Sequence, residues 1–146
     1  MAVRFVSEDI LFDLKGKNTY KQWIHAVAAA EGGRKVGDIA YIFCSDEYLH
    51  KINTQYLNHD TLTDIITFDY TEENTIAGDI FISIERVKDN ATTFNVPFSD
   101  ELLRVLIHGI LHLLGYEGKQ ADKKTVMTGK ENQYISLFKK EFASKL

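Results

Sequence analysis

The sequence contains a single cysteine and no long hydrophobic run, which excludes several classes of protein. Cys44 is the only cysteine, so the chain cannot form an internal disulfide, which is typical of proteins from a reducing compartment. No segment approaches the ~20 consecutive apolar residues that span a bilayer. The first residues, MAVRFVSEDILFDL, lack the basic start and apolar run of a signal peptide. We therefore expect a soluble, cytoplasmic protein.

Positive and negative charges are nearly balanced along the chain. The chain carries 17 Lys and Arg residues against 21 Asp and Glu residues, a formal net charge of −4. This balance argues against a protein that coats nucleic acid with its whole surface, although it leaves room for one basic groove. A length of 146 residues, 45% of them hydrophobic, predicts that residues 1–146 form one globular domain with a substantial core.

Alternating hydrophobic patterns predict an α+β fold, with a small mixed sheet of about four strands packed with helices. Strands are expected at residues 3–8, 37–45, 63–70 and 78–84. Helices are expected from about residue 18 to the glycines at 32–33, at 46–57 behind a Ser45 cap, at about 84–94, from a Ser99 cap to Gly115, and from about residue 121 onward. The strands 63–70 and 78–84 adjoin without a helix between them, which predicts an antiparallel pair.

The segment DELLRVLIHGILHLLG is the most informative of these elements. It is apolar almost all round, as is typical of a helix in the core. His108 and His112 are four residues apart, so their Cβ atoms lie ~5–6 Å apart on one face. One divalent ion would satisfy both rings, which are costly to bury without partners. Gly109 leaves space where a ligand or another backbone could approach. The alternative is a pair of core or boundary histidines bonded to carbonyl groups or buried water.

The spacing does not match a zinc peptidase. The H-E-x-x-H motif of those enzymes places a glutamate next to the first histidine as the general base. Gly109 occupies that position here and cannot take a proton. We therefore disfavour a peptidase.

Three blocks of the sequence resemble the YbeY family of metal-dependent endoribonucleases, which are rRNA maturation factors. RVLIHGILHLLGY, at residues 104–116, is similar to the family signature H-G-x-L-H-L-x-G-Y-D-H. NTQYLNHDTLTDIITF, at 53–68, is similar to N-x-x-Y-R-x-K-D-x-P-T-D-V-L-S-F, and AGDIFISIERV, at 77–87, to L-G-D-I-x-I. The resemblance extends over roughly residues 36–127. Leu57 replaces the arginine of the active cleft, His59 replaces a lysine, and Gly118 replaces the third metal histidine.

The resemblance implies a metal-dependent single-strand endoribonuclease of rRNA processing and ribosome maturation, with RNA and ribosomal components as partners and no membrane association. We expect one Zn²⁺ per chain, held by His108 and His112. Water is the first expectation for the remaining position, and Glu117, next to Gly118, is the first candidate among side chains. His59 and Asp122 rank below it.

Four further side chains are candidates for chemistry or RNA binding. Asp64, at the start of a predicted strand, could accept a proton or orient a water molecule. Alternatively, it is a strand-end residue bonded to backbone amides. Arg104, His59 and Lys119 are candidates for contacts with RNA phosphates. The alternatives are a turn-capping role for His59 and a solvated helix face for Lys119 and the lysines that follow it.

Tyr116 could stack on a base or simply pack the end of the histidine helix. The departures at Leu57 and Gly118 favour an alternative function, a ribosome- or RNA-associated binding protein of the same fold with little or no catalytic activity. A metal-dependent hydrolase of another substrate is a more distant alternative.

Overall fold

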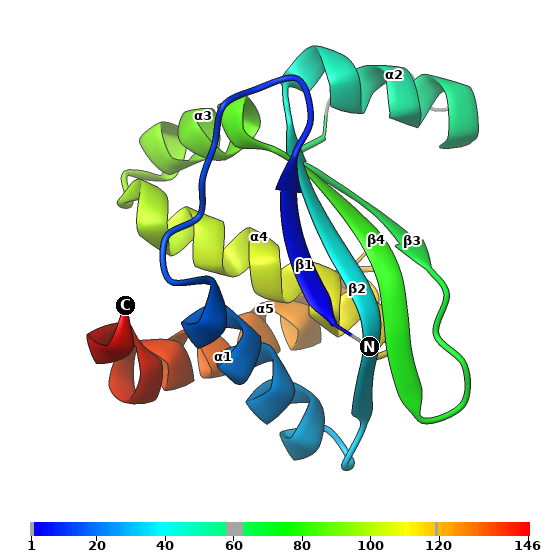
Figure 1. The fold of residues 1–146 in the computed structure, drawn as a ribbon, viewed down its shortest axis with the longest axis vertical. Coiled ribbons are helices and arrows are strands. Elements are labelled where there is room, and N and C mark those ends of the chain that lie inside the picture. Colours follow the sequence, from blue (N-terminus) through cyan, green and yellow to red (C-terminus); the bar gives the residue numbers. More distant parts are fainter. Residues whose placement is uncertain (1, 58–62, 119) are drawn as a thin grey trace.

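A four-stranded mixed sheet organises the computed structural model, which describes residues 2–57, 63–118 and 120–146 (Figure 1). Its strands are β1 (Val3–Ser7), β2 (Lys35–Cys44), β3 (Ile65–Asp69) and β4 (Thr75–Ser83), in the spatial order β1-β2-β4-β3. β1, β2 and β4 run parallel, and β3 pairs antiparallel with β4. The predicted α+β class and the antiparallel pair are therefore confirmed.

Helices cover both faces of this sheet unequally. They are α1 (Lys17–Ala30), α2 (Asp46–Leu57), α3 (Ile84–Phe94), α4 (Phe98–Leu113) and α5 (Ala121–Leu137), followed by a π-helical turn, η1 (Phe138–Phe142), and a 3₁₀ turn, η2 (Ala143–Lys145). In Figure 1, α1 and α4 lie against one face with α5 beside them, whereas α2 lies at the top right, away from them. None of the helices in the described ranges is long and apolar enough to cross a membrane.

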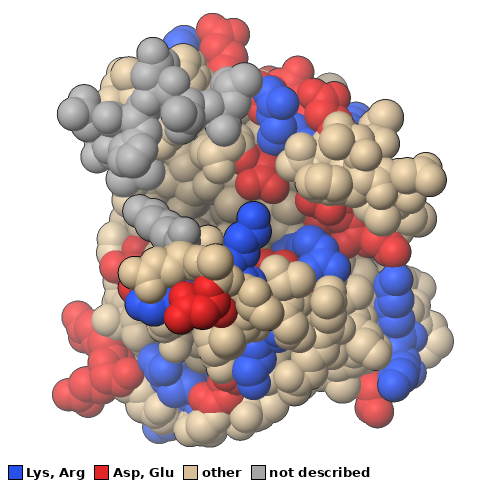
Figure 2. Space-filling view, turned by 180° about the vertical axis from the view of Figure 1, so that it is seen from behind, with Lys and Arg blue, Asp and Glu red and all other residues tan. Residues whose placement is uncertain are grey.

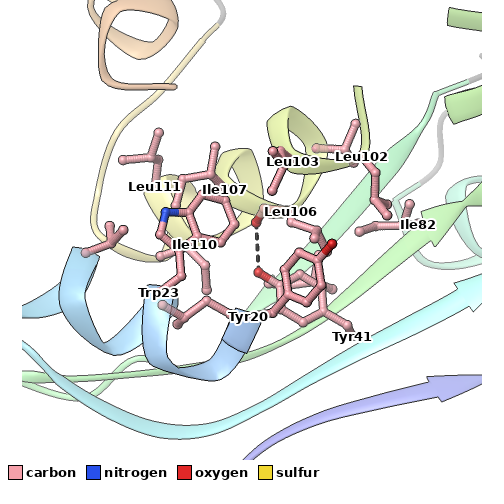
Figure 3. Packing of buried hydrophobic residues seen from close by; sticks show 14 of the residues in the cluster. Tyr20, Trp23, Tyr41, Ile82, Leu102, Leu103, Leu106, Ile107, Ile110 and Leu111 are labelled. Carbon is pink, nitrogen blue, oxygen red and sulfur yellow. Dashed lines mark hydrogen bonds between the residues drawn. The ribbon is translucent and has the colours of Figure 1, made fainter. Parts of the chain in front are cut away.

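The main core lies between the sheet and α4. Buried and less buried residues alternate along β4, so Ile76, Ile80 and Ile82 face the helices. In Figure 3, Leu106, Ile107 and Ile110 of α4 lie close to Trp23 of α1 and Tyr41 of β2. The Tyr41 hydroxyl donates a 2.8 Å hydrogen bond to the carbonyl of Leu106, so even the polar atom of this buried ring has a partner.

A second, smaller core packs α2 on the other face of the sheet. It consists of Cys44, Leu49, Ile52 and Ile66, with Tyr48, Phe68 and Phe81 packed against it. This cluster holds α2 beside β3 and β4. Because Ile66 of β3, two residues after Asp64, belongs to this cluster, the small core also holds the start of β3.

The structure corrects three expected boundaries. α4 begins at Phe98 and not after a Ser99 cap, because Pro97 occupies the N-cap position and its carbonyl accepts hydrogen bonds from the amides of Asp100 and Glu101 at 3.1 and 3.2 Å. β2 begins at Lys35, ahead of the predicted residue 37. β4 begins at Thr75, ahead of the predicted residue 78, since Lys35 and Thr75 already pair across the two strands.

Gly109 allows α4 to pack closely on the sheet. A Cβ at this position would lie 2.9 Å from two carbons of Ile80 and 3.3 Å from Cδ1 of Ile65. The space left by the missing side chain is therefore filled by isoleucines of β4 and β3. The expectation that a ligand or another backbone approaches here is wrong.

We expect Gly109→Ala to lower the free energy of unfolding by about 1–3 kcal/mol, because the new methyl group overpacks a core that cannot easily yield. Gly129→Ala is the matched control, since a Cβ at this exposed glycine of α5 meets nothing within 4 Å. That change should stabilise the protein by about 0.5–1 kcal/mol. Urea unfolding of both variants measures the difference, and equal effects of the same sign would contradict the packing described.

Candidate metal centre

His108 and His112 lie on the only polar stripe of α4 beyond its first turn. From Glu101 onward every residue of the helix is buried except Arg104, His108 and His112, which follow one another at intervals of four. The side chain of His108 is 35% exposed and His112 is exposed. The helix belongs to the core as predicted, but the expected burial of its two histidines is wrong. Their pairing with a metal therefore cannot be inferred from the cost of burying them.

Glu131 of α5 reaches across to the histidine stripe. Its Oε2 lies 2.7 Å from Nδ1 of His108, and its Oε1 accepts a 2.8 Å hydrogen bond from Nη1 of Arg104. Only 8% of the Glu131 side chain is exposed. Nη2 of Arg104 donates to Oδ1 of Asn132 at 2.7 Å, so two consecutive residues of α5 hold this guanidinium. Hydrogen bonds to α5 thus hold two of the three stripe residues, Arg104 and His108, in place.

Sequence analysis missed Glu131, although a signal for it exists. The buried residues of α5 are Met127, Glu131, Tyr134 and Ile135, which recur at helical spacing on one face. A glutamate within an apolar stripe requires a partner from another element. That partner, His108, lies 23 residues away, a separation that no local pattern connects.

Two carboxyl groups with raised pKa values lie near the stripe. Burial raises the pKa of Asp64, against the opposing effects of its own backbone amide, of nearby His108 and of a 3.4 Å hydrogen bond from Asn90. Burial also raises the pKa of Glu101, helped by Asp64 and opposed by Arg104. Buried groups with shifted pKa values are common in active sites. Asp64 is therefore a partly buried carboxyl group whose pKa responds to the charge of His108.

Comparison with known proteins identifies the family of this chain. The model of the family described as endoribonuclease YbeY matches residues 4–139. The chain belongs to the YbeY family. Because the match runs from the second residue of β1 to beyond the end of α5, it covers the sheet except for Val3, and both helices that form the histidine site.

Curated relatives and a solved structure extend the match to nearly full length. An endoribonuclease YbeY from Flavobacterium johnsoniae is 55% identical over 127 residues, covering 87% of this chain and 91% of the relative. One from Parabacteroides distasonis is 48% identical over 141 residues, covering 97% and 99%. The solution structure of TM1509 from Thermotoga maritima is 30% identical, covers 99% of this chain and 93% of its own, and superposes with a TM-score of 0.68.

Among the described residues after α4, no His, Cys, Asp or Glu side chain forms a metal-binding group of three with the two histidines. Within residues 2–57, 63–118 and 120–146, no three His, Cys, Asp or Glu side chains are grouped so that they could hold a metal ion. The carboxylate of Glu117 forms a 2.9 Å ion pair with Lys123. Glu117 and Asp122 instead line a surface pocket of about 350 Å³ with Gly115, Tyr116, Lys123 and Val126. Gly118 has no positive φ and nothing within 4 Å of an added Cβ.

Some of the residues proposed from the YbeY resemblance fall outside the described part of the chain. His59 and Lys119 lie outside the described residues, as does the side chain of Leu57. Arg104 is described, but its guanidinium is engaged by Glu131 and Asn132. On the face drawn in Figure 2, basic side chains are interspersed with acidic ones and do not gather into one patch.

Tyr116 packs the end of α4. Its hydroxyl donates a 2.6 Å hydrogen bond to Glu31 at the end of α1, and Lys130 of α5 lies 5.8 Å from the centre of its ring. Glu31 also accepts hydrogen bonds from Lys130, at 3.0 Å, and from Tyr134. The packing role expected as one alternative for Tyr116 is therefore present, and the glutamate ties together three segments around the turn that follows His112.

Removing the charge of Glu31 should weaken the protein in a pH-dependent way. Hydrogen bonds from Tyr116, Tyr134 and Lys130 outweigh burial and lower the pKa of Glu31. The stabilisation is therefore complete above the ordinary glutamate pKa of about 4.3 and is lost as pH falls through the lower folded value. At neutral pH, Glu31→Gln should reduce the free energy of unfolding by about 1.5–3 kcal/mol.

Thermal unfolding across this pH range measures the effect. The difference between wild type and Glu31→Gln should shrink in acid. Glu72→Gln, an exposed glutamate between β3 and β4, should change little at any pH. A Glu31→Gln penalty that stayed constant down to the lowest pH would show that the charge is not the source of the stabilisation.

Asp64→Asn should separate a catalytic role from a structural one. Because burial raises the pKa of Asp64, its ionised form costs stability at neutral pH, and this cost disappears as pH falls through the raised pKa. The amide variant should therefore be at least as stable as wild type at pH 7, with no advantage in acid. RNA cleavage should fall by about 10²–10⁴-fold, as expected for loss of a proton acceptor. Loss of stability with unchanged cleavage would assign Asp64 to the fold alone.

Proposed function

We propose that this chain is a metal-dependent endoribonuclease that cuts single-stranded RNA, acts on rRNA during ribosome maturation, and works in the cytoplasm as one domain of residues 1–146. The names of the curated relatives support cleavage of RNA, at 48–55% identity over nearly the full length. The observation that carries the proposal is the pair formed by the half-buried His108 and the exposed His112, with Glu131 of a second helix bonded to His108.

The residues of the stripe fit a zinc ion. Metal-binding histidines commonly donate their other ring N–H to a carboxylate, and the 2.7 Å contact of His108 with Glu131 has that arrangement. His112, one turn on, would supply the second nitrogen. Zinc, at about one ion per chain, would supply a water of lowered pKa and a charge that polarises a phosphoryl oxygen. Water, or Glu117 among the side chains, would complete the coordination of the ion.

Side chains around the metal would then accept the proton and contact the phosphate. Asp64, whose pKa responds to the charge of His108, would accept a proton or orient the attacking water. Arg104 has two nitrogens engaged and a side chain that is 37% exposed, so its remaining donors would face a phosphate oxygen. His59 and Lys119 would add contacts with the RNA backbone, and ribosomal components would present the substrate.

Incubation of purified protein with an end-labelled single-stranded rRNA fragment tests the function. The proposal expects internal cuts that a chelator abolishes and added zinc restores. An RNA hairpin of the same composition, with its bases paired, is the matched substrate control and should be cut less. Cleavage that persists in chelator would overturn the metal-dependent mechanism.

A second function has one specific observation in its favour. No third histidine or carboxylate joins His108 and His112 within the described parts of the chain, and Gly118 has no ligand atom. A catalytic zinc site usually keeps three protein ligands. A protein that binds RNA without cutting it would retain labelled fragment in the same experiment and leave it intact with or without zinc.

A further inference from the structure

The contact between Glu131 and His108 has a direction that the chemistry of its atoms dictates. An ionised carboxylate can only accept hydrogen bonds, so at the 2.7 Å separation Nδ1 of His108 must carry the hydrogen. In a neutral imidazole the other nitrogen, Nε2, then holds the free lone pair. Because Nδ1 is tied to α5, Nε2 lies on the far side of the ring from Glu131.

The carboxylate is itself held in place. Arg104 binds Oε1 while His108 binds Oε2, so each oxygen has its own partner. Asn132, the next residue of α5, accepts from the second terminal nitrogen of the same guanidinium. With 8% of its side chain exposed, Glu131 has little freedom to swing away from the histidine. The held carboxylate of Glu131 therefore fixes the orientation of the His108 ring through Nδ1.

The two histidines of the stripe differ in this respect. His112 is exposed, and no hydrogen bond to its ring comes from the described residues. His108 is therefore oriented by α5 before any metal binds, whereas the ring of His112 can still rotate. A site with few protein ligands gains most from a ligand that is already oriented, because less ordering is needed on binding.

We infer that Glu131 is a positioning residue that sets the Nδ1–H tautomer of His108 and so presents Nε2 to the metal. The inference rests on the metal site of the proposed function, but not on RNA cleavage. Loss of an outer partner of a metal-binding histidine typically lowers metal affinity about 10–100-fold. We expect a loss of that size in Glu131→Ala, and recovery of most of it in Glu131→Gln, whose amide oxygen can still accept from Nδ1.

Nitrogen-15 NMR of the metal-free protein, at a pH where the ring is neutral, reads the tautomer of His108 directly. Wild type and Glu131→Gln should show the Nδ1–H form, and Glu131→Ala should shift toward the Nε2–H form. Zinc titration of the same samples should show the matching order of affinities. Glu31→Gln is the control, because it removes another carboxylate that contacts α5 and should leave both readouts unchanged.

An unchanged His108 tautomer and zinc affinity in Glu131→Ala would overturn the inference, as would a wild type that binds no zinc. A general loosening of the helices would instead change Glu31→Gln and Glu131→Ala alike, which also overturns it. Wild-type protein that shows the tautomer and binds zinc, yet never cuts RNA, would reject the proposed nuclease and leave the role of Glu131 standing.

Discussion

Replacing His108 and His112 together by alanine should reduce bound zinc from about one ion per chain to none, because these two rings are the ligands on which the proposed site depends. RNA cleavage should fall to the background level for the same reason. The fold should survive, since both side chains lie on the exposed stripe of α4 and neither fills the core.

Elemental analysis of dialysed protein measures this prediction, with far-ultraviolet circular dichroism as the check on folding. His25→Ala is the matched control, because His25 is also exposed on a helix but belongs to α1. That variant should keep its zinc. Equal metal content in wild type and in the doubly substituted protein would place the ion elsewhere.

Gly118→His should raise zinc affinity more than about 100-fold, because it adds a ligand directly. Residues that only hydrogen-bond to a ligand typically contribute about 10–100-fold. The position corresponds to the third histidine of the family pattern. The substitution meets no obstacle in the structure, since Gly118 has ordinary backbone geometry and nothing lies within 4 Å of an added Cβ.

Competition with a chromophoric chelator gives the affinities. Gly129→His is the control, an exposed and unobstructed glycine of α5 that should leave zinc affinity unchanged. If wild type already binds zinc tightly, Gly118→His adds nothing and Glu117→Gln weakens binding, then Glu117 is the third ligand and would have to exchange its ion pair with Lys123 for the metal.

The fold was largely predictable because its patterns are local. Alternation predicted the strands, the i, i+4 spacing predicted the histidine stripe, and the absence of a helix between β3 and β4 predicted their antiparallel pairing. The failures occurred where a neighbour decided the outcome. Pro97 displaced the Ser99 cap, and pairing with Lys35 drew Thr75 into β4.

The site was less predictable because its contacts join distant segments. The two histidines and Asp64 were visible as residue types at suggestive positions, but their exposure depended on which sides of α4 the sheet and α5 cover. The apolar stripe of α5 marked Glu131 as a residue in need of a partner, but no local pattern pointed to His108, 23 residues away. Arg104 was predicted to face RNA, and only the fold shows that Glu131 and Asn132 already engage it.

A zinc-edge anomalous diffraction map from a crystal of the zinc-loaded protein shows directly whether the two histidines hold the ion. We expect one anomalous peak at about 2.0–2.1 Å from Nε2 of His108 and at a similar distance from a ring nitrogen of His112. Nδ1 of His108 should remain bonded to Glu131. A zinc peak remote from the two histidines, or one bound through Nδ1 of His108, would contradict it.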